Sequence, residues 1–137
     1  MELNDIFSKV FELLGRSGTF SEDLFQEGLY TSLGIINLLI SLVIVLSYYF
    51  FINKPNYNSI KHWFFFLIGN FALCLVIGYL YPKSVFTGLD LEYQFIEYLV
   101  FALKSGLIAT FMFIIWSYIF KWFKSHCQGT PKLFGKF

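Results

Sequence analysis

The chain has 137 residues, of which 57% are hydrophobic and only 14% are charged, and its formal net charge is +1. Soluble domains carry about one quarter charged residues, so this composition excludes an ordinary soluble protein, and the lack of a basic stripe argues against a nucleic-acid partner. The blocks 28–53, 62–82 and 105–120 contain no Asp, Glu, Lys or Arg. A bilayer core about 30 Å thick needs about 20 apolar helical residues. The sequence therefore predicts an all-α integral membrane protein with three transmembrane helices, preceded by a short amphipathic N-terminal helix.

Residues 1–29 are predicted to form an extracytoplasmic, amphipathic helical segment. Apolar residues recur at helical spacing over 3–15, before a glycine-containing stretch that is expected to end this helix. A second short helix is expected over about 21–29, where Thr19 and Glu22 have the spacing of a capping box.

This N-terminal segment has three interpretations. It lies on the bilayer surface or folds against the spans, it docks a partner protein through Phe7 and Phe11, or it is a lytic helix. Surface-seeking helices usually carry several Lys or Arg residues that meet anionic lipids. The first helix has Lys9 as its single basic residue, so electrostatic binding to lipid is not favoured.

The transmembrane region is predicted over residues 30–123. Tyr and Trp gather near the ends of the apolar blocks, which is typical of interfacial aromatic belts. The two connections are short, and Pro55 and Pro82 are expected to stop the helices next to them. The spans are expected at about 30–52, 63–81 and 98–123.

Positive charge gathers on one side of this predicted topology. The first connection and the C-terminal tail together hold six lysines and no acids, whereas the other side holds all nine Asp and Glu residues. Cytoplasmic loops carry the excess of Lys and Arg, so we expect an extracytoplasmic N-terminus and a cytoplasmic C-terminus in the cytoplasmic (inner) membrane. Residues 124–137 would then form a basic cytoplasmic tail, and Phe134 in this tail and Trp122 just before it lie against lipid or dock into a partner.

Each span carries one line of small and polar residues. In lipid, close packing and hydrogen bonds drive helix association, so such residues mark packed interfaces. We interpret the lines as the meeting faces of the protein's own three-helix core. The alternatives are an interface with another subunit and an aqueous pore, which would need polar residues at more depths. The predicted interface residues are Gly34, Asn37 and Ser41 in the first span, Gly69, Asn70, Cys74 and Gly78 in the second, and Ala102, Gly106 and Thr110 in the third.

Lys104 is the one charge inside an apolar span, and such residues call for a functional hypothesis. It follows Glu97 by seven residues, which puts both on nearly the same helix face, and it should lie about 9 Å inside the interface at about 1.5 Å per residue. Lys104 either snorkels to that interface, pairs with Glu97 or with an N-terminal acid, or couples to ion movement. The last role is weakened because the spans offer no Asp, Glu or His to complete a relay.

The sequence contains no catalytic, cofactor-binding or metal-binding pattern. There is no nucleophile with a base, no phosphate loop and no zinc motif, and His62 and His126 lack ligand spacing. We therefore expect no cofactor, no enzymatic activity and no nucleic acid, with the lipid bilayer and other membrane subunits as partners.

The favoured function is a non-enzymatic membrane subunit. It would be an anchor or scaffold in a larger homo- or hetero-oligomeric membrane complex, such as a bacterial secretion or injection machine. One alternative is a small channel or a holin-like protein that permeabilises membranes. Another alternative is a membrane immunity protein against a pore-forming toxin.

Overall fold

The computed structural model describes residues 3–13, 15, 18–52 and 60–120 of the chain. Within these ranges the chain is helical and forms no strand, which confirms the predicted all-α class. Three of the helices are long and apolar enough to cross a membrane, as the sequence predicts. The elements are α1 (Leu3–Glu12), α2 (Thr19–Gln26), α3 (Leu29–Leu46), the π-helix η1 (Ser47–Ile52), α4 (Ile60–Gly88) and α5 (Phe95–Phe120).

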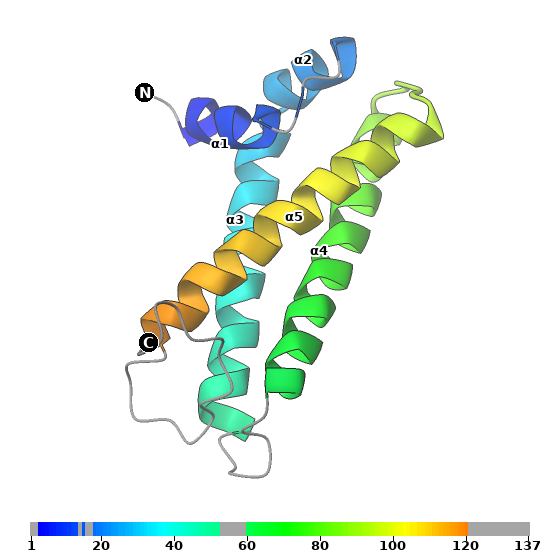
Figure 1. The fold of residues 1–137 in the computed structure, drawn as a ribbon. Helices are drawn as coiled ribbons and strands as arrows, with labels where there is room; N and C mark the ends of the chain where they lie inside the picture. Colours follow the sequence, from blue (N-terminus) through cyan, green and yellow to red (C-terminus); the bar gives the residue numbers. More distant parts are fainter. Residues whose placement is uncertain (1–2, 14, 16–17, 53–59, 121–137) are drawn as a thin grey trace.

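The N-terminal segment forms two short helices at one end of the bundle, where α1 lies across the long helices (Figure 1). The predicted capping box is wrong, because Gly18 occupies the N-cap of α2 without a side-chain hydrogen bond and Thr19 is the first helical residue. Gly28 separates α2 from α3 with a φ of 66°. This left-handed conformation carries no steric penalty for glycine, so the chain can turn sharply from the cap into the first span.

The three long helices agree with the predicted spans at most of their ends. The first candidate span covers Leu29–Phe50, with a mean hydropathy of 2.3, and the third begins at Phe95, three residues before its predicted start. The predicted end of the third span at 123 lies outside the described residues. So does the connection over 53–59, which contains Pro55.

Pro82 does not end the second span, contrary to the sequence prediction, because α4 continues to Gly88. A proline removes one backbone donor and crowds the carbonyl four residues earlier, but transmembrane helices tolerate it where neighbouring elements pack around it. Pro82 is buried, and Phe86 beyond it is fully buried against Phe20 of α2, with ring centroids 5.7 Å apart. Tertiary packing thus holds the last turns of α4 in helical form.

α5 runs diagonally across α3 and α4 and packs against both (Figure 1). An aromatic cluster fills the bundle at each end, one under α1 and α2 and the other beside η1. In the second cluster, the adjacent Tyr48 and Tyr49 of the π-helix are both fully buried and Trp63 is 3% exposed. These rings therefore pack against one another inside the end of the bundle.

Candidate functional site

Two glycines bring α4 and α5 into close contact. A Cβ on Gly78 would lie 2.7 Å from Cβ of Ser105 and 3.3 Å from Cα of Ala102. A Cβ on Gly106 would lie 2.8 Å from the ring of Phe71. An added Cβ at Gly78 would therefore push α4 and α5 apart, whereas one at Gly106 would require the ring of Phe71 to shift. The close approach supplies the van der Waals contact that holds helices together in lipid.

A polar layer joins the three spans at the level of Asn37. Its amide Nδ2 donates to Oγ of Ser105 at 2.9 Å, and Oγ of Ser105 donates to the carbonyl of Cys74 at 3.4 Å. All three side chains are fully buried. One residue from each of α3, α5 and α4 thus meets at a single point in the core.

A second polar layer lies one helical turn further along α3, at Ser41. Asn70 donates through Nδ2 to the carbonyl of Ala109 at 2.9 Å and to Oγ of Ser41 at 3.2 Å. Ser41 in turn donates to the same carbonyl at 3.1 Å. Interhelical hydrogen bonds of this kind contribute about 0.6 kcal/mol each on average in membrane proteins, so the layer fixes the register of the helices more than it stabilises them.

A third polar contact was missed by the sequence analysis. The indole Nε1 of Trp63 donates to Oγ of Ser117 at 3.1 Å inside the aromatic cluster beside η1. Ser105, Ala109, Phe113 and Ser117 recur every four residues and are all buried. This spacing is the sequence signal that could have placed Ser117 on the packed side of α5.

The ten predicted interface residues do not all lie in the core. Thr110 is half-buried and donates to the carbonyl of Gly106 within its own helix at 2.9 Å, because the packed line of α5 passes one residue before it. Gly69 is exposed, and a Cβ there would meet no atom within 4 Å. The buried members are Gly34, Asn37, Ser41, Asn70, Cys74, Gly78, Ala102 and Gly106.

α1 packs directly onto the first span. A Cβ on Gly34 would lie 2.2 Å from the ring of Phe7. The missing side chain of this glycine therefore makes room for α1 rather than for another span. Phe11 is 1% exposed and stacks on Phe101 of α5 with ring centroids 5.3 Å apart. A partner protein could not reach the Phe11 ring unless α1 moved. Trp122 and Phe134, the other predicted docking residues, lie outside the described residues.

α2 is held to the same end of the bundle by aromatic contacts and one hydrogen bond. Phe20 is fully buried, with its ring edge-on to those of Tyr93 and Tyr98 at centroid distances of 5.0 and 5.5 Å. The hydroxyl of Tyr93 donates to Oδ2 of Asp23. These contacts make α1 and α2 a cap on the bundle, as expected if the N-terminal segment folds against the spans.

Lys104 ties this cap to α5. Its Nζ donates to the carbonyl of Gly15, between α1 and α2, at 2.5 Å, and the carboxylate of Glu12 acts on the ammonium electrostatically. Glu97 instead accepts a hydrogen bond from the backbone N–H of Gln94 at 3.3 Å and caps the start of α5. The hydrogen bonds therefore place Lys104 at the loop between α1 and α2, and Glu97 at the start of α5.

No family model, curated protein or solved structure matches this chain.

The buried polar groups of the described spans contribute to packing, and no chemistry is evident from them. Asn37 and Asn70 are neutral amides, and their Nδ2 groups donate to serine and backbone oxygens. Within the described residues, no three His, Cys, Asp or Glu side chains gather where they could hold a metal ion. The arrangement can hold three helices in a fixed register.

Proposed function

We propose that this chain is a non-enzymatic subunit that anchors or scaffolds a larger membrane protein complex. One observation supports the proposal: the buried donors of Asn37, Ser41, Trp63 and Asn70 hydrogen-bond within the bundle, and only the Oδ1 atoms of Asn37 and Asn70 among these four side chains accept no hydrogen bond. The side chains that face outward from these spans are largely Leu, Ile, Val and Phe. Such a surface acts by contact with lipid and with other proteins.

The outer face of α4 is the best candidate for contact with another subunit. In an 18-residue apolar stretch of α4, only 22% of the residues are buried inside the protein, whereas the share is 39% in the corresponding stretches of the first and third spans. Gly69 and Ala72 are both exposed on this helix. In membranes, such small residues let a second helix approach closely.

Two apolar grooves flank this face of α4. One is lined by Ile40, Val43 and Leu73, among others, and the second by Val76, Leu80 and Leu99. Ridges of side chains on one helix pack into grooves of another, so the shape of this face of α4 suits a helix from a neighbouring subunit.

We further propose a bacterial cytoplasmic (inner) membrane as the location, with the N-terminus outside and the C-terminus in the cytoplasm. The support is the charge distribution of the sequence, in which one side of the topology holds six lysines without an acid. α1, α2 and the loop between α4 and α5 would then face the extracytoplasmic side.

Site-specific photocrosslinking in the native host tests the proposed function. A benzophenone amino acid at Ala72 is expected to form an adduct with a specific membrane protein, which mass spectrometry identifies. The same probe at Ile119, an exposed position of α5, is the matched control and should react with lipid alone. Lipid adducts at both positions would contradict the proposal.

A further inference from the structure

Two amide oxygens in the core are buried and accept no hydrogen bond. They are Oδ1 of Asn37, in the first polar layer, and Oδ1 of Asn70, in the second, and both side chains are fully buried. A buried acceptor without a donor costs free energy. Buried polar groups in proteins are therefore almost always hydrogen-bonded, either to the protein or to ordered water. Each of these two oxygens thus calls for a donor.

Backbone carbonyls fix the orientation of both amides. Nδ2 of Asn37 donates to the carbonyl of Ser105 at 3.4 Å as well as to its Oγ, and Nδ2 of Asn70 donates to the carbonyl of Ala109 at 2.9 Å. A carbonyl oxygen can only accept a hydrogen bond. Turning either amide over would place its Oδ1 against a carbonyl oxygen, so an exchange of the oxygen and nitrogen positions does not supply the missing donors.

The other donors of the two layers are already used. A serine hydroxyl has a single hydrogen to donate. The hydroxyl of Ser105 donates to the carbonyl of Cys74, and the hydroxyl of Ser41 donates to the carbonyl of Ala109. The Nδ2 group of Asn70 donates to that carbonyl and to Oγ of Ser41. Within the described residues, these layers therefore leave two acceptors without a donor, one in each amide.

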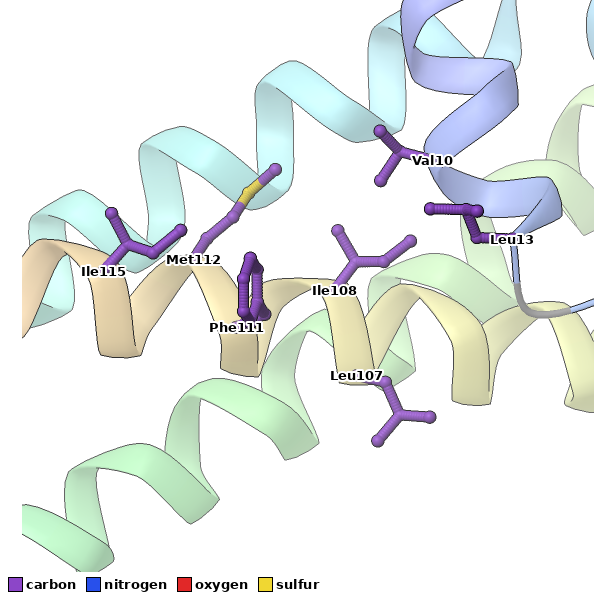
Figure 2. A pocket seen from close by; sticks show the side chains of 7 residues that line it. All are labelled: Val10, Leu13, Leu107, Ile108, Phe111, Met112 and Ile115. Atoms are coloured by element: carbon purple, nitrogen blue, oxygen red, sulfur yellow. The ribbon is translucent and has the colours of Figure 1, made fainter.

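The outer side of α5 does not supply these donors either. Figure 2 shows Leu107, Phe111 and Ile115 on that side, where they line an apolar groove with residues of the N-terminal segment. Ser105 and Ala109 lie at the same level of this helix and are fully buried. A donor for the two amides must therefore be enclosed between the helices.

We propose that the core holds one buried water molecule, which donates one hydrogen to Oδ1 of Asn37 and the other to Oδ1 of Asn70. Asn37 lies on α3 in the first layer, and Asn70 lies on α4 in the second, one helical turn or about 5.4 Å further along. Two hydrogen bonds of about 2.8 Å each span such a distance. The neighbouring Ser41, Cys74 and Ser105 have short side chains, as a water site between packed helices requires.

Water suits these two acceptors better than a metal cation does. Ca²⁺ and Mg²⁺ take at least six ligands, most of them oxygens, whereas a buried water needs two to four polar partners. The serine hydroxyls and carbonyls of the layers already accept hydrogen bonds. The water would add a link between α3 and α4 to the bond from Asn70 to Ser41. This inference requires a folded bundle and holds independently of the scaffold role.

Nuclear magnetic resonance on the perdeuterated full chain in lipid nanodiscs tests the proposal. We expect a nuclear Overhauser effect from water to the Nδ2 protons of both Asn37 and Asn70. The indole N–H of Trp63 is the matched control, because it is also buried and lies beside a serine hydroxyl, that of Ser117, at 3.1 Å. It should show no such effect. Absence of the effect at either amide, or an equal effect at Trp63, would overturn the proposal.

A variant tests whether one water serves both amides. Asn37→Leu keeps a similar side-chain volume but removes one acceptor. The effect at Asn70 should then be lost, although the direct bonds of Asn70 to Ala109 and Ser41 remain. Ser117→Ala removes a buried polar group elsewhere on α5 and should leave the effect unchanged at both amides. If Asn37→Leu does not fold, the reciprocal Asn70→Leu, read at Asn37, replaces it.

Two results would contradict a shared water. An effect that persists at Asn70 in folded Asn37→Leu would mean that the two amides bind separate waters. Chemical shifts of the two amides that change when Na⁺ replaces K⁺ in the buffer would indicate a bound cation in place of water.

Discussion

At the scale of single residues, the fold depends on positions where a side chain would not fit. Gly78→Leu should destabilise the bundle by about 1–3 kcal/mol, the usual cost of overpacking, because even a Cβ would lie 2.7 Å from Ser105. Val76→Leu, at a position that is 51% exposed on the same helix, should change stability by less than about 0.5 kcal/mol. Unfolding in graded detergent mixtures gives both values, and equal tolerance would contradict the packing of α4 against α5.

Lys104 supports a second prediction at this scale. Because its ammonium bonds to Gly15, three residues beyond Glu12, a double-mutant cycle of Lys104→Leu with Glu12→Gln should give a coupling of up to about 1 kcal/mol. The parallel cycle with Glu97→Gln should give none. A larger coupling to Glu97 would mean that α1 does not hold the lysine. Loss of function in Lys104→Leu with unchanged stability would instead indicate ion coupling.

The sequence predicts which types of residue form the packed core, but it does not place every one of them on the correct face of its helix. Small and polar side chains mark helix interfaces in lipid for a general physical reason, and Asn37, Asn70 and Gly78 follow it. Gly69 is equally small but lies on the opposite, exposed side of α4. The link from Trp63 to Ser117 depends on the crossing of α4 and α5, which no local pattern determines.

At the scale of elements, the long helices could be predicted because a bilayer imposes their length and apolar character. The extension of α4 past Pro82 could not, since it depends on tertiary contacts of Phe86 with Phe20 and Tyr93. The role of α1 likewise depends on the fit of Phe7 over Gly34. Amphipathic spacing indicates a helix with one apolar face but does not say which surface that face meets.

Phe86 supports a prediction about the end of α4. Phe86→Ala removes a fully buried ring, and such a loss typically costs about 3–5 kcal/mol. We expect the amides of the last turns after Pro82 to exchange with deuterium much faster, while those of the preceding turns stay protected. Tyr81→Ala, at an exposed position, is the control. Unchanged exchange after Phe86→Ala would show that the aromatic cluster does not hold these turns.

At the scale of the whole molecule, the proposed orientation rests on the charge distribution of the sequence rather than on packing. A single cysteine replacing Asp90, in the loop between α4 and α5, should react with an impermeant reagent on intact cells, in a background without Cys74 and Cys127. A single cysteine at Ser125 should react only after the membrane is opened. The reverse pattern would contradict the proposed topology.

The central proposal is that the bundle uses its polar groups internally and leaves the outer face of α4 for another subunit. Purification in gentle detergent, with the masses of the complex measured, tests it most directly. The unmodified chain should carry a stoichiometric membrane partner. Gly69→Leu should lose that partner and remain folded, because no atom lies within 4 Å of the added Cβ. A partner-free unmodified chain, or a Gly69→Leu chain that keeps its partner, would contradict the account.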